Sequence, residues 1–126
     1  MRVLVDSDVL IDILSGVPAA RDALSAARTH GDSLVSITPV RTEILRGVAQ
    51  HDLRGAGELL GVLGWIDVDV SLADSAASLG RPYQRSHQGI SITDLLLAAA
   101  VERVGGQLLT RNVRHFPMLP GLLPAY

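Results

Sequence analysis

The sequence predicts an α/β protein, a three-layer α/β/α sandwich with a mostly parallel central sheet. Short apolar runs of strand type alternate along the chain with longer segments of helical periodicity. A helix between two strands allows both strands to run in the same direction, and helices then cover both faces of the sheet. With 126 residues, 48% of them hydrophobic, the chain has the size and composition of one domain, which we expect to span residues 1–126.

The first half of the chain is expected to begin with a strand and a helix in direct succession. The apolar run 3–5 is too short for a helix, whereas one helical face is shared by Val9, Leu10, Ile13 and Leu14. Further along, Thr38 and Pro39 form a favourable helix start, with threonine as the cap and proline at the first position. The remaining elements predicted here are a helix at 19–30, a strand at 33–37, a helix from Thr38 to about residue 50 and a helix at about 54–63.

The second half is expected to continue the alternation. Ser71 and Asp74 resemble a capping box at the start of a helix, and Pro82 is expected to kink or shorten that helix. The predicted elements are a strand at 65–70, a helix at 71–86, a loop at 87–91, an alanine-rich helix from Thr93 to Gly105, a strand at 107–110 and a last edge strand at 122–123.

The composition excludes several classes of function. The chain has no cysteine, which removes disulfides, thiolate zinc sites and a cysteine nucleophile. All eleven basic residues are arginine, so no mechanism that needs a lysine is possible. No apolar run approaches the roughly 18 residues of a membrane span, and the N-terminus leads directly into a strand without a signal-peptide pattern. We therefore expect a cytoplasmic protein without a membrane partner.

Three acidic residues fall at the ends of predicted elements. Asp6 ends the first strand, Glu43 lies early in the helix after the second strand, and Asp94 lies in the first turn of the alanine-rich helix. In a parallel sheet the carboxyl ends of strands and the amino ends of helices gather at one edge, where ligands bind. Like charges that converge need a cation, and carboxylates without soft ligands suit Mg²⁺ or Mn²⁺.

Each of these acids also has a purely structural explanation. Asp6 or Ser7 could cap the first helix, and Asp94 would stabilise a helix N-terminus by ~0.3–1 kcal/mol without any catalytic role. Glu43 could be an ordinary residue on a solvated helix face. Only the coincidence of all three positions favours a functional site.

Four segments of the chain, in order, carry a resemblance to a known family. They are residues 3–12 (VLVDSDVLID), 36–47 (SITPVRTEILRG), 90–100 (ISITDLLLAAA) and 109–116 (LTRNVRHF). Together they resemble the successive motifs of the PIN-domain nucleases, and within that family the ribonuclease toxins of VapBC toxin–antitoxin systems. Each motif alone is weak, but four in the right order over essentially the whole chain are specific.

The resemblance implies a PIN-like fold and a metal-dependent endoribonuclease, the toxin of a type II toxin–antitoxin system. The implied cofactor is Mg²⁺ or Mn²⁺, and the implied partners are an RNA substrate, a small VapB-like antitoxin and a second copy of the chain. A metal held by carboxylates can activate a water molecule and neutralise charge on the scissile phosphate, so no nucleophilic side chain is needed.

Carried over by position, the resemblance assigns Asp6 and Asp94 as metal-binding aspartates and Glu43 as the third acid, all three being catalytic. Supporting roles fall to the polar residues beside them, namely Asp8, Thr110 and Asn112.

The loop after the fourth strand departs from the family pattern. Many members carry an aspartate at the position of Asn112 or of His115, and this chain has neither, which weakens any second metal site. We expect His115, next to the apolar Phe116, to be a surface or capping residue. Arg111 and Arg114 follow the same strand and are the best candidates for RNA phosphate contacts, although a solvated loop is an equal explanation.

Other functions remain open at this stage. The strand followed by Asp-x-Asp also resembles haloacid-dehalogenase phosphatases and receiver domains, but both need a lysine that this chain lacks. A degenerate PIN domain that only binds a partner or RNA is a further alternative, favoured by His115 at an acidic position of the family.

Overall fold

The computed structural model describes residues 1–126 and contains one sheet of four parallel strands in the order β3-β2-β1-β4. The strands are β1 (Arg2–Val5), β2 (Ser33–Ile37), β3 (Gly64–Ile66) and β4 (Gln107–Leu109). Leu4 of β1 pairs with Val35 of β2 on one side and with Leu108 of β4 on the other. The chain adds β2 and β3 on one side of β1 and then returns to place β4 on its other side. The boundary between β1 and β4 is therefore the point where strand order reverses, which is where open α/β sheets bind ligands.

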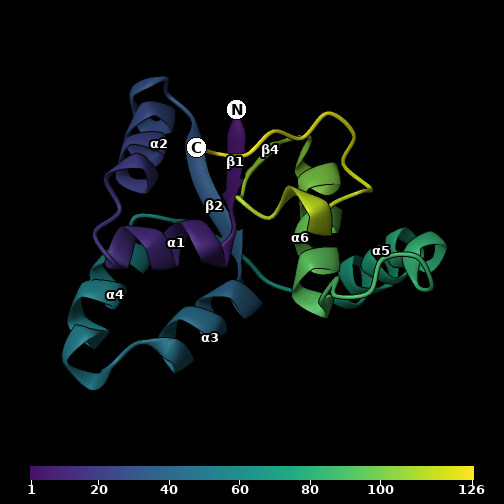
Figure 1. The fold of residues 1–126 in the computed structure, drawn as a ribbon, viewed down its shortest axis with the longest axis horizontal. Coiled ribbons are helices and arrows are strands. Elements are labelled where there is room, and N and C mark those ends of the chain that lie inside the picture. The colour runs from purple at the N-terminus through teal and green to yellow at the C-terminus, as the bar shows by residue number, and fades with distance from the viewer.

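Helices lie on both sides of the sheet, which confirms the predicted three-layer α/β/α fold. Figure 1 shows α1, α2 and α4 to one side of the strands and α5 and α6 to the other. The helices are α1 (Ser7–Leu14), α2 (Pro18–Thr29), α3 (Thr38–Gly47), α4 (Leu53–Leu60), α5 (Val70–Gly80) and α6 (Ile92–Val104), with short 3₁₀ turns η1 (Gln50–Asp52), η2 (Arg81–Tyr83) and η3 (Val113–His115). No helix is both long and apolar enough to cross a bilayer.

The core lies on the two faces of β1 and around α6. Val3, Leu4 and Val5 are at most 2% exposed, as expected for a central strand that is covered on both faces. All residues from Leu96 to Val101 of α6 are buried, because this alanine-rich helix packs on the sheet and is itself covered by α5. Burial of this kind fixes the positions of the strand ends and of the α6 N-terminus, where the predicted acids lie.

Helix starts differ from the predicted ones in two places. Asp69, not Ser71, caps α5, and its carboxylate accepts a hydrogen bond from the Leu72 amide. The strand before it therefore ends at Ile66 rather than at residue 70. At α3 the cap position is Ile37, which makes no side-chain capping bond. Proline near the helix start removes one of the amides that would otherwise need a partner, so no threonine cap is required.

The C-terminal tail contains no strand, so the predicted edge strand at 122–123 is wrong. Prolines at 120 and 124 lack the amide that a ladder needs, and Gly121 has a φ of 79° that breaks an extended conformation. The tail instead contacts the sheet through one backbone hydrogen bond, from the Ala125 amide to the Thr110 carbonyl at 2.8 Å. The predicted effect of Pro82 is confirmed, since α5 ends at Gly80 and a 3₁₀ turn follows.

Candidate active site

Asp6 lies at the carboxyl end of β1 and is only 4% exposed. Its Oδ1 accepts a hydrogen bond from the Ser7 amide at 2.7 Å, so it caps α1 as the sequence suggested. Its Oδ2 accepts a hydrogen bond from the Thr110 hydroxyl at 2.8 Å, across the boundary between β1 and β4. Asp6 therefore caps a helix and also lies where it can belong to a ligand site.

The Asp6 carboxylate is electrostatically strained. Burial, followed by the negative charge of Asp8 and a smaller contribution from Asp94, raises the pKa of Asp6 from its ordinary value of 3.8 to about 6. The hydrogen bonds from Thr110 and Ser7 act in the opposite direction and only partly offset these effects. A buried carboxylate in the field of two other acids is a favourable place for a cation.

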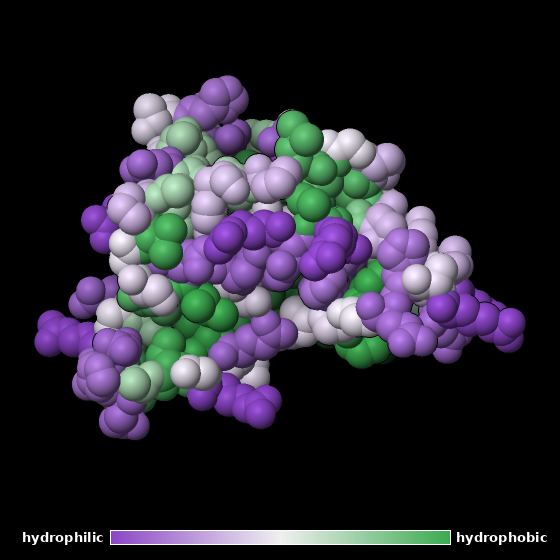
Figure 2. Space-filling model, viewed as in Figure 1, coloured by the Kyte–Doolittle hydropathy of each residue, from purple (hydrophilic) through white to green (hydrophobic).

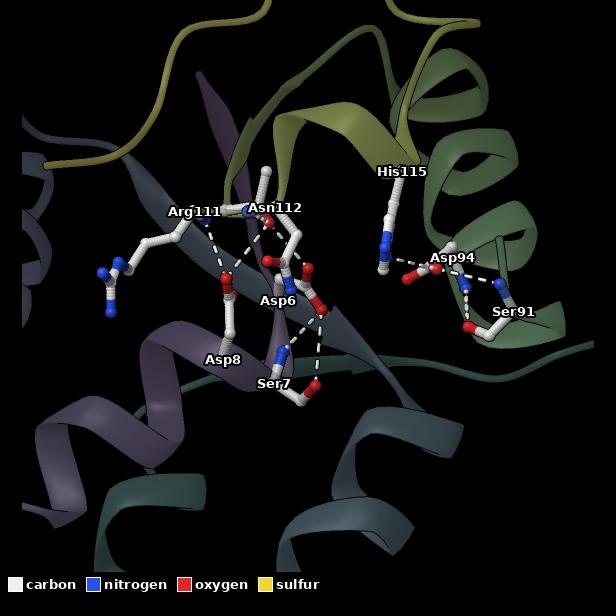
Figure 3. Close-up of polar contacts among 9 residues, drawn as sticks. Asp6, Ser7, Asp8, Ser91, Asp94, Arg111, Asn112 and His115 are labelled. Atoms are coloured by element: carbon white, nitrogen blue, oxygen red, sulfur yellow. Dashed lines mark hydrogen bonds and ion pairs between the residues drawn. The ribbon is translucent and has the colours of Figure 1, made fainter. Parts of the chain in front are cut away.

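Asp8 links α1 to the loop after β4 through hydrogen bonds. Its Oδ1 accepts a hydrogen bond from the Val9 amide at 2.8 Å. Its Oδ2 accepts one from the Arg111 amide, also at 2.8 Å (Figure 3). The Thr110 hydroxyl is 3.4 Å from Asp8 but 2.8 Å from Asp6, so its single hydrogen goes to Asp6. Both Asp8 oxygens are therefore occupied by backbone amides.

Asp94 enters the same region from the N-terminus of α6 and is 8% exposed. It forms a capping box with Ser91: Oδ2 accepts from the Ser91 amide at 2.9 Å, and the Asp94 amide donates to the Ser91 hydroxyl at 3.1 Å. Oδ1 accepts no hydrogen bond, and Figure 3 shows the Asp94 carboxylate directed toward Asp6. As with Asp6, a capping role and a site position coincide in one residue.

His115, expected to be a surface or capping residue, is partly exposed but also contacts the site. Its Nδ1 lies 3.2 Å from Oδ2 of Asp94, although 39% of the side chain is exposed (Figure 3). The 3₁₀ turn η3, which follows Asn112, brings His115 over the α6 N-terminus, while Phe116 is buried in the core and anchors the turn. No local pattern in the sequence predicts this contact, because it depends on how the loop after β4 returns over α6.

Glu43 lies apart from the aspartates. It is exposed on α3, and its charge is not among those that shift the pKa of Asp6, whereas the charges of Asp8 and Asp94 are. It lines a surface groove of about 420 Å³ with Ile11 and Leu14 of α1. No three histidine or carboxylate side chains are arranged to hold a metal ion between them. The structure thus brings two of the three predicted acids together and leaves the third at the adjacent groove.

Thr110 and Asn112 extend the site from the end of β4. Thr110 is completely buried, and its hydroxyl accepts a hydrogen bond from the Asn112 amide at 3.0 Å while it donates to Asp6. The Asn112 side chain is exposed and forms no hydrogen bond with the protein. A neutral amide at this place leaves a free oxygen and a free NH₂ group for a ligand.

The two predicted RNA-binding arginines have different environments. The Arg111 guanidinium donates to Asp12 at 2.9 Å, and its carbon lies 5.5 Å from the centre of the Tyr126 ring. Arg114 is exposed and forms no ion pair. Sequence reasoning missed Asp12 and Tyr126 as neighbours of this site, since Tyr126 lies in a tail without a recognisable motif.

The donor set fits a hard divalent cation. Asp6 and Asp94 offer carboxylate oxygens only, with no thiolate nearby, which suits Mg²⁺ or Mn²⁺. Mg²⁺ commonly takes one or two carboxylates from a protein and completes its shell with water and substrate phosphate, so a preformed cage of three side chains is not required. The raised pKa of Asp6 is the structural sign that a positive charge would be stabilising here.

Comparison with known proteins identifies the family. The model of the PIN domain family matches residues 3–120. Ribonuclease VapC19 of Mycobacterium tuberculosis is 37% identical over 123 residues, covering 98% of both chains, and ribonuclease VapC10 is 39% identical over 124 residues, covering 98% of this chain and 92% of VapC10.

Solved structures share the fold at lower identity. A toxin–antitoxin complex from Klebsiella pneumoniae has a TM-score of 0.83 at 23% identity, and covers 98% of each chain. VapBC2 from Rickettsia felis, bound to a DNA fragment from its promoter, has a TM-score of 0.76 at 15% identity and covers 98% of this chain and 97% of that one. With a family model over nearly the whole sequence and relatives of 37–39% identity, the chain belongs to the PIN-domain family.

Proposed function

We propose that this protein is a VapC-type endoribonuclease, the toxin of a type II toxin–antitoxin system, which cleaves RNA with a divalent metal. The observation that carries the proposal is the pair of buried aspartates, Asp6 and Asp94, at the point where strand order reverses. The names of its relatives in Mycobacterium tuberculosis, both ribonucleases, support the same activity.

The two aspartates would hold the metal, and the neighbouring residues orient them. Asp6 and Asp94 would hold Mg²⁺ or Mn²⁺, which when bound supplies an activated water molecule and neutralises charge on the scissile phosphate. The Thr110 hydroxyl fixes the rotamer of Asp6, and the Ser91 capping box fixes that of Asp94. Glu43, in the adjacent groove, would contribute through water or substrate rather than by direct contact with the other acids.

RNA would approach over the loop after β4. Arg114 is the better placed of the two predicted phosphate ligands, because it is exposed and unpaired, whereas Arg111 is committed to Asp12. The exposed Asn112 amide can donate to a phosphate oxygen or offer its carbonyl to a cation. Figure 2 shows a hydrophilic band across this face, flanked by hydrophobic patches.

A small VapB-like antitoxin is the proposed partner, and the toxin itself would form a homodimer. The Klebsiella and Rickettsia neighbours are toxin–antitoxin complexes. The groove between α1, α3 and α4 is lined by apolar residues such as Ile11, which is 49% exposed, and also by Glu43. An antitoxin segment with apolar residues and an arginine would match this groove and could neutralise the acidic site.

Cleavage of a mixed RNA pool by purified protein tests the proposal. We expect cleavage with Mg²⁺ or Mn²⁺, none with chelator, and none by Asp6→Asn under any metal condition. Asp22→Asn is the matched control, because Asp22 is an exposed surface acid on α2 and should leave cleavage unchanged. Cleavage by Asp6→Asn at the wild-type rate would contradict the proposal.

A binding-only PIN domain is the second candidate. It is favoured by the lack of three side chains arranged around a common metal position and by His115 beside Asp94. RNA or antitoxin binding without cleavage, in all metals tested and with the antitoxin removed, would support it.

A further inference from the structure

Asp12 on α1 is the meeting point of two residues from distant parts of the chain. Its Oδ2 accepts a hydrogen bond from the Tyr126 hydroxyl at 2.7 Å and another from Arg111 Nη1 at 2.9 Å. The Arg111 guanidinium also lies over the Tyr126 ring at 5.5 Å. Each of the three side chains therefore contacts the other two, and we call this triangle of Asp12, Arg111 and Tyr126 the clasp.

Near neutral pH the clasp consists of an Asp12 anion, an Arg111 cation and a neutral Tyr126. The hydrogen bond from Tyr126, and then Arg111, hold the pKa of Asp12 below its ordinary value, so Asp12 is an anion. Burial and the charge of Asp12 raise the pKa of Tyr126, so its hydroxyl keeps the proton that it donates. The arrangement thus needs no titration to form, and it persists over the pH range in which RNA cleavage would be assayed.

Thr110 and Arg111 form hydrogen bonds with the carboxylates of the acidic site. The amide of Arg111 donates to Asp8 at 2.8 Å, and the preceding residue, Thr110, donates its hydroxyl to Asp6 at 2.8 Å. The tail reaches the same segment a second time, because the Ala125 amide donates to the Thr110 carbonyl at 2.8 Å. Two successive residues of the tail, 125 and 126, therefore hold two successive residues of the site, 110 and 111.

We propose that the clasp positions the Thr110–Arg111 segment so that Asp6 is held ready for metal and Asp8 is fixed beside it, with Asp12 and Tyr126 as positioning residues of the nuclease. This inference rests on the proposed metal-dependent cleavage. It assigns Arg111 a role that differs from the one its sequence suggested: its charge is used within the protein, and its backbone amide orients Asp8. Partners that orient metal ligands commonly affect metal affinity or activity about 10–100-fold when removed.

Removal of single hydroxyl groups tests the proposal with little effect on packing. Tyr126→Phe deletes the bond to Asp12 and keeps the ring, while Tyr83→Phe is the matched control, because the Tyr83 hydroxyl forms no hydrogen bond with the protein. Asp12→Asn keeps an acceptor but loses the charge, and Asp12→Ala loses both, which gives a graded series. For each variant we would measure Mn²⁺ affinity by electron paramagnetic resonance without RNA, kcat and KM on a cleaved oligonucleotide, and the melting temperature.

The expected result is weaker Mn²⁺ binding and a lower kcat with unchanged KM, about tenfold for Asp12→Ala and less for Tyr126→Phe and Asp12→Asn, with Tyr83→Phe like wild type. A lower melting temperature with unchanged Mn²⁺ affinity and kcat would overturn the proposal, since the clasp would then only stabilise the fold. A raised KM alone would also overturn it and make Arg111 an RNA ligand. If Asp12→Ala fails to fold, Tyr126→Phe and Asp12→Asn decide the question. A wild type that binds no Mn²⁺ would contradict the metal site itself, whereas equal affinity in all variants would contradict only the clasp.

Discussion

Asp6 is a buried carboxylate whose charge is unfavourable unless a cation is bound. The unfolded chain has the ordinary pKa near 3.8, whereas burial and the charge of Asp8 raise the pKa to about 6 in the folded protein. The folded state therefore holds the proton more tightly, and the free energy of unfolding falls as pH rises through this window, by about 3 kcal/mol in total. Above about pH 6, the folded protein carries the full cost of the buried Asp6 charge.

Replacement of Asp6 by asparagine should remove this penalty. We expect Asp6→Asn, in chelator, to be more stable relative to wild type at about pH 7 than at about pH 4, because only the higher pH charges the wild-type carboxylate. Urea unfolding at both pH values measures the difference, with Asp22→Asn as the control. An equal effect at both pH values would show that the charge of Asp6 is not strained.

Asp94 combines a capping bond with a position in the site, and two substitutions separate these roles. Asp94→Asn keeps an oxygen for the Ser91 amide, whereas Asp94→Ala removes it and should cost about 1 kcal/mol of stability. Both variants should lose RNA cleavage. Thermal melts in chelator, beside cleavage assays, measure the two effects. If either variant still cleaved RNA, Asp94 would serve only as a helix cap.

The Nδ1 atom of His115 lies 3.2 Å from Oδ2 of Asp94. His115→Asp would place a second carboxylate beside Asp94, so it should tighten binding of a further metal ion and lower the metal concentration needed for cleavage. Calorimetric titration with Mn²⁺ measures the change. His51→Asp, at an exposed position on η1, is the control and should have no effect. An unchanged titration for His115→Asp would place the second ion elsewhere.

At the residue scale the sequence predicted positions better than contacts. Asp6 and Asp94 are recognisable because a strand signal ends at the first and a helix signal begins at the second, and both lie where the topology requires. The contact between His115 and Asp94 and the bonds of Asp12 to Arg111 and Tyr126 were not predictable, since each joins segments that have no common local pattern. They depend on the path of the loop and tail over the finished sheet.

At the element scale, the alternation of strands and helices was sufficient to predict the parallel sheet. The wrong predictions concern one helix cap and one strand. Asp69 caps α5 in place of Ser71, and the tail has no strand because its prolines lack amides. Glu43 shows a different limit. Its helix is predicted correctly, but periodicity alone does not set the direction of an exposed side chain, and Glu43 lines a groove with residues of α1.

Close packing between β1 and the start of β4 sets the distance between Asp6 and Thr110. A Cβ atom added to Gly106 would collide with the carbonyl oxygen of Arg2. We expect Gly106→Ala to destabilise the fold by about 1–3 kcal/mol, because backbone cannot move aside as a flexible side chain can. Gly47→Ala is the control, since nothing lies within 4 Å of its added Cβ, and chemical denaturation compares the two. Equal stability of both variants would show that β4 can shift without cost.

At the scale of the whole molecule, function follows from the order of the strands. Because the chain returns to place β4 beside β1, residues 104 positions apart in sequence share a hydrogen bond at the sheet edge. α6, on the opposite side of the sheet from α1, then brings Asp94 to the same edge (Figure 1). The strand order thus brings the acidic residues together. The neighbouring residues supply hydrogen-bond donors that orient the carboxylates, and none of them supplies a nucleophile.

On the proposed mechanism, the paired aspartates support attack on RNA by a metal-activated water. End-group analysis of the cleaved RNA tests this most directly, because attack by the neighbouring 2′-hydroxyl leaves a 2′,3′-cyclic phosphate and attack by water does not. We expect fragments without cyclic phosphate, formed by wild type with Mg²⁺ or Mn²⁺ and absent with chelator or with Asp6→Asn. Cyclic phosphate ends, or cleavage that persists in chelator, would contradict it.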